Sequence, residues 1–330
     1  MLKIGKLDNS LLKKIVLDKI KYRRDEVMVR PGIGEDCAVL DYGEYECVLS
    51  TDPITAAIEK IGSLAVHISC NDIASNGIEP VGLLLTVLLP EGTTENDIEE
   101  LMAQAARAAG DLKVEIIGGH TEITQAVSQP VIVSTAVGRG FKGASQSAEQ
   151  MKPGDHIYIT KTAGLEGTGI MATDKREELS KLLTKEELEE AVSMLEEVSV
   201  VKEGVLAGKV GTSGMHDITE GGVLGAVWEL CNIADVGAEV FYEDIPISPL
   251  TTKICKAFDL NPLRLISSGS MMIIVNENNV EKMEKYMADA NIKLTEIGTI
   301  KPKKDGLIMI KNGEPTEIQP PGSDEIYKLV

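Results

Sequence analysis

Carboxylate, amide and imidazole side chains stand beside glycine or at the end of apolar runs in five short segments of the sequence. These segments are Gly32–Asp36, Ser50–Asp52, Asn71–Asp72, Gly118–Glu122 and Met215–Gly222. Oxygen ligands are what Mg²⁺ prefers in proteins, and glycine lets phosphate groups approach backbone N–H groups without an intervening Cβ atom. The five segments therefore predict a protein that binds ATP together with Mg²⁺.

Asp36 and Asp52 are the first pair of candidate metal ligands. Residues 36–40 and 47–49 read as strands joined by a polar turn, which is typical of a hairpin. Pairing of these strands places the two carboxylates near one another, where they repel unless a cation lies between them. In this interpretation Gly34 gives the nucleotide access to the backbone. The alternative is that Gly34 only forms a turn and each aspartate caps its own turn.

Asp72 lies on the apolar stripe of a predicted helix. Ile61, Leu64, Ala65 and Ile68 recur at intervals of three or four residues, and Asp72 follows Ile68 by four. A carboxylate on a core face has to be neutralised, hydrogen-bonded or bound to a cation, because an unpaired buried charge is very costly. We therefore take Asp72 as a metal ligand and catalytic candidate. The alternative is that the helix frays by Asn71 and that Asp72 faces water.

The segment Gly118–Glu122 follows a short apolar strand. Gly118 and Gly119 would let a phosphate reach the main chain, with Thr121 beside them, while His120 and Glu122 offer a metal ligand, a proton carrier or a substrate contact. We expect the other histidines without such neighbours, His67 and His156, to be ordinary hydrogen-bonded side chains.

Asp217 combines with glycine at the predicted start of a helix. Thr219 is the expected N-cap, and Gly221 and Gly222 would present the helix N-terminus to an anion while the Asp217 carboxylate binds metal. The alternative is a capped helix with two loose glycines. The glycine-containing segment 164–169 is a further, less specific candidate for a phosphate loop.

The order of predicted elements indicates two domains. Residues 81–89 read as a strand buried on both faces, 95–109 as a helix, and 114–117 and 131–137 as further strands, so the first half is α/β. The polar, glycine-containing segment 138–154 is the expected linker, which divides the chain into domains 1–150 and 151–330. In the second half, a charged helix at 186–199 and alternating strands and helices from 271 to 310 predict an α+β domain with helices over a mixed sheet.

Composition excludes several classes of partner. The 330 residues carry a formal net charge of -19, with 43% hydrophobic and 26% charged residues, so a core can form in each half. This charge disfavours nucleic acid and anionic membrane surfaces. The longest apolar run is far too short to span a bilayer, and residues 1–6 lack the apolar core of a secretory signal. We expect a cytoplasmic protein.

The two commonest nucleotide-binding signatures are missing, because neither a Gly-x-x-x-x-Gly-Lys-Ser/Thr loop nor a Gly-x-Gly-x-x-Gly fingerprint after a strand occurs. The ordered set of motifs instead resembles the aminoimidazole ribonucleotide synthetase (PurM-like) superfamily. The resemblance is strongest to the hydrogenase-maturation HypE branch. It rests on Gly-Ile-Gly-Glu-Asp-Cys-Ala-Val-Leu (32–40), Ser-Thr-Asp-Pro (50–53), Asn-Asp-Ile-Ala-Ser-Asn-Gly-Ile-Glu-Pro (71–80), Gly-Gly-His-Thr-Glu (118–122), Leu-Glu-Gly-Thr (165–168) and Met-His-Asp-Ile-Thr-Glu-Gly-Gly (215–222).

The resemblance implies a first domain whose strands join those of a second copy in a dimer β-barrel, and a second domain that closes over ATP. Asp36, Asp52 and Asp72 would hold Mg²⁺ on the phosphates, with Asp217 as a further ligand, and Gly118, Gly119 and His120 would line the phosphate path. The shared chemistry is activation of an amide-type or other oxygen by phosphorylation.

One feature differs from the HypE pattern. HypE-type proteins carry a cysteine at the extreme C-terminus, whereas the last cysteine of this sequence is Cys255. We therefore expect a homodimeric enzyme, dependent on Mg²⁺ and ATP, that phosphorylates or dehydrates a separate small substrate. The alternative is a nucleotide-binding maturation or assembly partner without turnover. The resemblance also implies other maturation proteins as partners.

Overall fold

The computed structural model describes residue 5 and residues 7–55 and 60–329 of the chain. The segment expected to lack a secretory signal, residues 1–6, lies almost wholly outside the described residues. Within these residues two β-sheets organise the fold, one of six and one of seven strands. The strands of the first sheet lie between Val27 and Phe141 and those of the second between His156 and Glu317. The boundary expected near residue 150 falls between them and stays a prediction.

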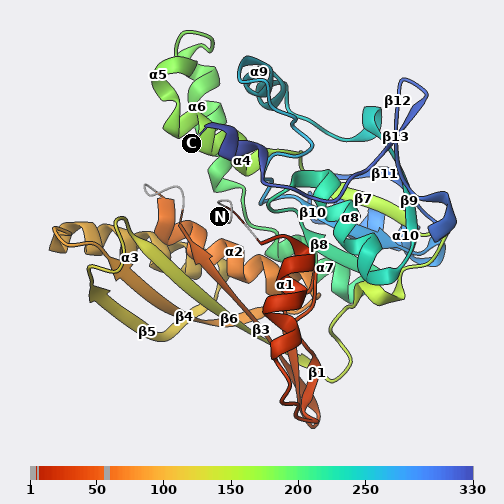
Figure 1. Cartoon of the computed structure of the whole chain (residues 1–330), viewed down its shortest axis with the longest axis horizontal. Helices are drawn as coiled ribbons and strands as arrows, with labels where there is room; N and C mark the ends of the chain where they lie inside the picture. Colours follow the sequence, from red (N-terminus) through yellow and green to blue (C-terminus); the bar gives the residue numbers. More distant parts are fainter. Residues whose placement is uncertain (1–4, 6, 56–59, 330) are drawn as a thin grey trace.

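The first sheet has the strand order β1-β2-β3-β6-β4-β5. Its strands are β1 (Val27–Val29), β2 (Ala38–Tyr42), β3 (Tyr45–Ile54), β4 (Pro80–Leu89), β5 (Glu115–Ile123) and β6 (Val131–Phe141). The predicted hairpin is confirmed, because β2 and β3 pair antiparallel with Ala38 opposite Leu49. Helices α2 (Ile61–Ser75) and α3 (Glu95–Leu112) lie on one side of the sheet (Figure 1). The expected linker began too early, since residues 138–141 belong to β6.

The other face of this sheet is open in the described chain. The prediction that residues 81–89 are buried on both faces was wrong: Val81 is 48% and Leu84 41% exposed, while Leu83 and Leu85 are buried under the helices. The side chains of β3 and β6 alternate in the same way between buried and less buried positions. The sheet does not close on itself, so the chain alone does not form the expected barrel.

The second sheet has the order β13-β12-β9-β11-β7-β10-β8 and is mixed, because β12 runs parallel to β9 and the other pairs are antiparallel. The strands are β7 (His156–Thr160), β8 (Gly214–Asp217), β9 (Gly237–Phe241), β10 (Met271–Val275), β11 (Leu294–Lys301), β12 (Leu307–Lys311) and β13 (Glu314–Glu317). The associated helices are α4 (Leu165–Asp174), α5 (Arg176–Leu179), α6 (Lys185–Ser193), α7 (Val201–Val210), α8 (Gly222–Ala234), α9 (Pro249–Ala257) and α10 (Val280–Asp289). This arrangement matches the predicted α+β half.

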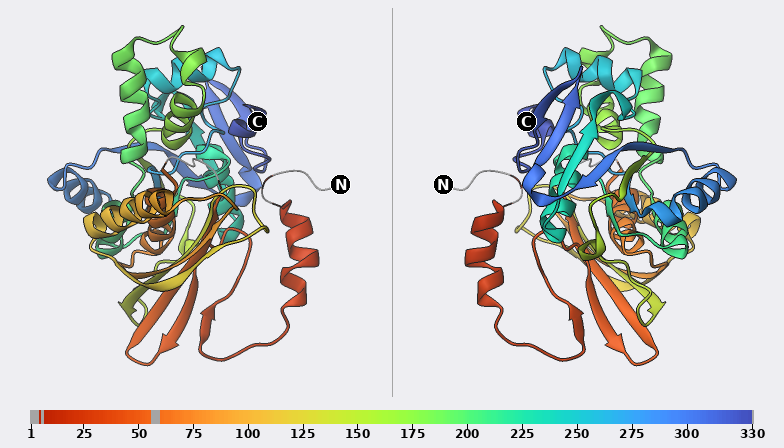
Figure 2. Two further views of the ribbon diagram at one scale, coloured as in Figure 1. Left: turned by 90° about the vertical axis from the view of Figure 1, so that its left-hand side faces the viewer. Right: turned by 90° about the vertical axis from the view of Figure 1, so that its right-hand side faces the viewer.

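Local sequence signals set several helix ends. Thr94 caps α3 and Thr184 caps α6, each in a capping box with the residue three positions later, Asp97 and Glu187. The helix expected at 186–199 is shorter, because α6 ends at Ser193 and a 3₁₀ turn follows. Helix α1 (Asn9–Ile15) has no buried residue and stands at the periphery of the molecule (Figure 2). No helix in the described ranges is both long and apolar enough to cross a membrane.

The two halves share one hydrophobic core. Ile73 and Ala74 of α2 belong to the same buried cluster as Leu195 and Val201 from the second half. Helix α7 approaches α2 so closely that a Cβ atom on Gly204 would lie 2.2 Å from the backbone oxygen of Ala74. This contact fixes α2, which carries Asp72, against the second half of the chain.

Candidate magnesium and nucleotide site

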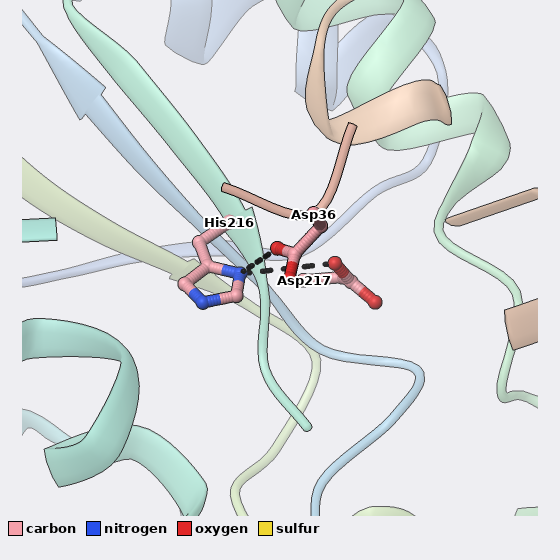
Figure 3. Close-up of side chains that lie close together, drawn as sticks. All are labelled: Asp36, His216 and Asp217. Carbon is pink, nitrogen blue, oxygen red and sulfur yellow. Dashed lines mark ion pairs between the residues drawn. The ribbon is translucent and has the colours of Figure 1, made fainter. Parts of the chain in front are cut away.

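Asp36, His216 and Asp217 form a cluster of ligand atoms within 4.8 Å of one another. His216 Nδ1 lies 3.4 Å from Asp36 Oδ2 and 3.8 Å from Asp217 Oδ1 (Figure 3). Asp36 comes from the loop before β2, whereas His216 and Asp217 end β8 of the other sheet. The cluster therefore lies where the two halves of the chain meet.

Asp217 is almost completely buried, at 1% exposure. Its Oδ1 atom is 3.0 Å from the Ser75 hydroxyl of α2, and its backbone N–H donates to the same hydroxyl at 3.1 Å. Its Oδ2 atom has no hydrogen-bond partner among the described residues. A buried carboxylate oxygen without a partner is costly, so this atom fits a position that a bound cation would satisfy.

Asp72 is buried within α2, which continues to Ser75, so the alternative of a frayed helix and an exposed Asp72 was wrong. The Ser50 hydroxyl of β3 donates to Asp72 Oδ2. Burial, and then the negative charges of Asp217, Asp36 and Asp52, raise the pKa of Asp72 well above its usual value. Ser50 and Asp52 lie two residues apart on the strand face toward α2. The four predicted metal ligands thus lie close enough to interact.

His216 was not among the predicted ligands. It is buried, and its Nε2 atom lies 3.0 Å from Glu229 Oε2 of α8. Burial acts to lower the pKa of His216, but the carboxylates of Asp36, Asp217 and Glu229 outweigh it and raise the pKa well above the usual value. The sequence signal that could have identified His216 as a ligand is its position immediately before Asp217. A strand turns neighbouring side chains to opposite faces, which argued against the two meeting.

Gly34 shapes the loop that carries Asp36. Its φ is +81°, and a Cβ atom there would lie 2.9 Å from Ile233 Cδ1 of α8. The positive φ favours glycine at this position, whereas the terminal methyl group of Ile233 could move aside. The close packing against α8 brings Asp36 to His216, so Gly34 acts on the site through the shape of this loop.

The segment Gly118–Glu122 does not join the cluster within one chain. It lies in β5, at the far edge of the sheet from β2. Four strand spacings separate the two strands, or about 19 Å at the usual spacing. His120 and Glu122 are exposed and lie 3.1 Å apart through Nε2 and Oε2. Gly119 has a structural reason to be glycine, because a Cβ atom would lie 1.9 Å from the Leu85 oxygen of β4.

The expected anion site at Gly221 and Gly222 is already engaged. The Gly221 N–H donates to Asp324 Oδ2 at 2.8 Å, and the Gly222 N–H donates to the Thr219 oxygen at 3.1 Å. Gly221 is the N-cap of α8, so the expectation that Thr219 caps this helix was wrong. A carboxylate of the chain itself therefore occupies the position where a phosphate was expected.

The two remaining histidines differ. His156 bridges Glu296 and Glu277 at 2.8 and 2.7 Å, as expected of a hydrogen-bonded side chain. His67 is different, because its Nδ1 atom is buried without a partner in the described structure. Burial lowers the pKa of His67 to about 4, so it is neutral near pH 7.

The fold has two domains. The first contains a sheet with helices on one face, and the second contains a mixed sheet with its own helices. A candidate cation site lies where the two domains meet. Residues 34–140 match the family "AIR synthase related protein, N-terminal domain", and residues 152–311 match the corresponding C-terminal domain. The chain belongs to the AIR synthase related family.

Within this family the chain is similar to hydrogenase-maturation proteins. It is 30% identical to carbamoyl dehydratase HypE of Bradyrhizobium diazoefficiens over 73% of this chain and 70% of the relative. It is 27% identical to a putative hydrogenase expression/formation protein of Methanocaldococcus jannaschii over 84% and 82% of the two chains.

Solved structures support the same fold. HypE in complex with ATP has a TM-score of 0.74 at 21% identity and covers 98% of this chain and 97% of its own. The HypE–HypF complex contains a chain with a TM-score of 0.75 at 23% identity, covering 88% of this chain and 94% of its own.

Proposed function

We propose that this protein is an ATP-dependent enzyme that phosphorylates, and thereby dehydrates, a carbamoyl or other primary amide group. The observation that supports this most directly is the group of four aspartates at the domain contact, where Asp217 Oδ2 has no partner among the described residues. Family membership supports the choice of ATP, and the similarity to carbamoyl dehydratases supports the choice of acceptor.

The donor set fits Mg²⁺. Asp36, Asp52, Asp72 and Asp217 supply the carboxylate oxygens that a hard cation prefers, and their mutual repulsion decreases when a cation lies among them. The bound ion supplies neutralisation of the charge that develops on the phosphates. The protein contributes a fixed arrangement, since Ser75 orients Asp217 and Ser50 orients Asp72.

The chemistry has two parts in this proposal. The amide oxygen attacks the γ-phosphorus atom, an O–P bond forms, and the bond to ADP breaks. The nitrogen loses its two protons to solvent or phosphate, the C–O bond breaks and a C≡N bond remains. Phosphate is the leaving group in this step, and it is a far better leaving group than an unphosphorylated amide oxygen. Binding between the two domains orients the amide toward the γ-phosphate.

The amide is proposed to arrive on a separate molecule. Cys37, Cys70, Cys231 and Cys255 are buried, and burial raises the pKa of Cys255 to about 12. Cys47 is half-buried on the open face of the first sheet, away from Asp72 on the helix-covered side. Cys37 lies beside the aspartates, because its thiol donates to the Asp72 backbone oxygen at 3.3 Å, but burial and then the neighbouring aspartates raise its pKa well above the usual value. It is therefore not an accessible thiolate.

We further propose a homodimer in which the open sheet faces of two copies form a barrel. The apolar side chains of this face, such as Val81 and Leu84, lose contact with water in such a dimer. Dimerisation also gives Gly118–Glu122 a place in the site, because the edge strand of one copy then approaches the partner copy. His120, Thr121 and Glu122 are assigned to the partner's nucleotide in this arrangement.

The test compares Asp36→Asn with Asp41→Asn. Both aspartates belong to the same hairpin region, but Asp41 pairs with Lys142 on the surface at 2.6 Å. With Mg-ATP and S-carbamoyl-L-cysteine as the acceptor, we expect ADP release from wild type and Asp41→Asn and at least a 100-fold loss in Asp36→Asn. Tight Mg-ATP binding without ADP release for any carbamoyl or amide acceptor would instead favour a nucleotide-binding assembly partner.

A further inference from the structure

The segment that precedes the first sheet contains a helix that its own chain does not bury. Residues 9–24, called the N-terminal arm below, comprise α1, a 3₁₀ turn and an irregular stretch that leads toward β1. No residue of α1 is buried, and no residue of the arm belongs to or packs against a described core cluster. Figure 2 shows α1 standing apart from the rest of the molecule. The arm therefore adds nothing to the described core of its own chain.

The apolar residues of α1 share one side of the helix. Leu11 and Ile15 are four residues apart, as are Leu12 and Val16, and this spacing places all four side chains on one face. Ile15 is 43% and Val16 40% exposed, and Tyr22 is exposed farther along the arm. Neighbouring exposed apolar side chains of this kind mark a surface that contacts another molecule.

The arm is basic although the protein is acidic. It contains six basic residues and one acidic residue, whereas the whole chain has a formal net charge of -19. The basic residues are Lys13, Lys14, Lys19, Lys21, Arg23 and Arg24. Arg24 pairs with Glu26, but none of the four lysines forms an ion pair with a described residue. An apolar helix face among positive charges fits a partner surface that is apolar and acidic.

Strand β5 offers such a surface at the edge of the first sheet. It is 9 residues long and pairs only with β4 among the described strands, so its outer edge has no strand partner there. Ile117 is 54% and Ile123 50% exposed, and Glu115 and Glu122 are exposed on the same strand. A long edge strand with exposed apolar side chains pairs readily with another chain unless something covers it.

The position of the arm favours the β5 of a second copy over that of its own chain. The arm enters the sheet at β1, where the Asp41 N–H donates to the Glu26 oxygen at 2.8 Å. Within one chain, β1 and β5 are opposite edges of the sheet, five strand spacings or about 24 Å apart. The proposed dimer brings β5 of one copy to the Asp36 loop of the other, and this loop follows β1 directly. The arm of one copy and β5 of its partner therefore meet at this edge.

We propose that the N-terminal arm of each copy packs on β5 of a second copy of this chain. The apolar face of α1 covers Ile117 and Ile123 of that copy, and the lysines of the arm face its acidic side chains. This inference rests on the proposed homodimer and gives the arm a role in it. By covering β5, the arm holds the partner's His120 beside the nucleotide of its own copy.

Cross-linking between copies tests the contact directly. Full-length Val16→Cys and Ile123→Cys chains, each with a different tag, are co-expressed and treated with a short bismaleimide. We expect a cross-linked species that carries both tags, because only a contact between copies can join them. The matched control combines Val16→Cys with Leu182→Cys, since Leu182 is equally exposed but lies in the second half of the chain. We expect no doubly tagged species from the control.

The strength of the dimer tests the apolar face and the charges separately. Ile15→Asp should raise the dissociation constant of the dimer at least tenfold in sedimentation experiments, because it places a charge in the contact. Its circular dichroism spectrum should match that of wild type, since Ile15 has no place in the described core. Replacing Lys13 and Lys14 by glutamine should make the dissociation constant less sensitive to salt, because fewer charges are left to screen.

The outcomes distinguish the arm contact from the proposals on which it rests. A wild-type protein that is monomeric at micromolar concentration contradicts both the dimer and the arm contact. If wild type is a dimer, the arm contact alone is overturned by either of two results. One is the absence of a doubly tagged species from Val16→Cys with Ile123→Cys, and the other is an unchanged dissociation constant for Ile15→Asp. ADP release by wild type, measured on the same preparation, tests the proposed enzyme activity independently.

Discussion

The hydroxyl of Ser75 lies 3.0 Å from Oδ1 of Asp217 and 3.1 Å from its backbone nitrogen, although 142 residues separate the two in the sequence. The same hydroxyl is 2.9 Å from the Asn71 oxygen of α2, and its single proton can go to only one of its two acceptors at a time. A hydroxyl of the first half of the chain therefore positions a candidate metal ligand of the second.

Ser75→Ala tests this connection. The buried N–H of Asp217 loses its acceptor, which should lower the free energy of unfolding by about 1–3 kcal/mol and weaken Mg-ATP binding. Ser69→Ala is the control on the same helix, because Ser69 donates to the Ser134 oxygen at 3.2 Å and does not contact Asp217. Chemical denaturation and calorimetry measure the two effects. Equal Mg-ATP affinities in the two variants would contradict the positioning role.

Asp72→Asn should reduce the increase in melting temperature that Mg²⁺ binding causes. In wild type we expect Mg²⁺ alone to raise the melting temperature by several degrees, because ligands that bind the folded state stabilise it and the cation relieves repulsion among the aspartates. In Asp72→Asn the metal-free protein should melt no lower than wild type, and the gain with Mg²⁺ should shrink. Thermal melts in EDTA and in MgCl₂ measure this. A full Mg²⁺ response in the variant would remove Asp72 from the ligand set.

Leu84→Glu tests the dimer. Leu84 is 41% exposed on the open sheet face, and a charge there would be buried in the proposed interface at high cost. The variant should sediment as a monomer while wild type sediments as a dimer. Leu182→Glu is the control, because Leu182 is 43% exposed in the second half of the chain. A wild-type protein that is monomeric at micromolar concentration would end the barrel proposal.

Mixed dimers test the assignment of His120 to the partner's site. His120→Ala and Asp36→Asn should each lose most activity as homodimers. In a mixed dimer, one of the two sites contains neither substitution if each site combines Asp36 of one copy with His120 of the other. Co-expression of differently tagged copies should therefore restore activity. No restoration would show that His120 and Asp36 do not share a site between copies.

The lowered pKa of His67 should reduce the free energy of unfolding at acidic pH. Burial lowers its pKa to about 4, below the 6.5 of an unfolded histidine. Between these values the unfolded state binds more protons, so this contribution is present above pH 6.5 and is lost as the pH falls toward 4. Its full size is about 3 kcal/mol at 1.36 kcal/mol per pKa unit. The free energy of unfolding of His67→Gln, measured over this range, should depend less on pH than that of wild type. Equal slopes would contradict the neutral, buried state.

Regular patterns in the sequence predicted much of the fold. The stripe of Ile61, Leu64 and Ile68 predicted α2 and the inward position of Asp72, because helical spacing places these residues on one face. The hairpin of β2 and β3 was readable from its polar turn. The prediction that residues 81–89 are buried on both faces was wrong, because an apolar run does not distinguish a strand covered on both faces from one that leaves a face open.

The sequence by itself determined which residue types are available, namely carboxylates beside glycines in a recurring order, and that order identified the family. Only the tertiary structure decided which of them meet. Asp36, Asp72 and Asp217 converge because α2 packs against α7 and β8, while β5 keeps Gly118–Glu122 at the far edge of its sheet. Asp324 reaches Gly221 in the same way, across 103 residues. Such contacts depend on long-range packing, which local propensity and spacing do not specify.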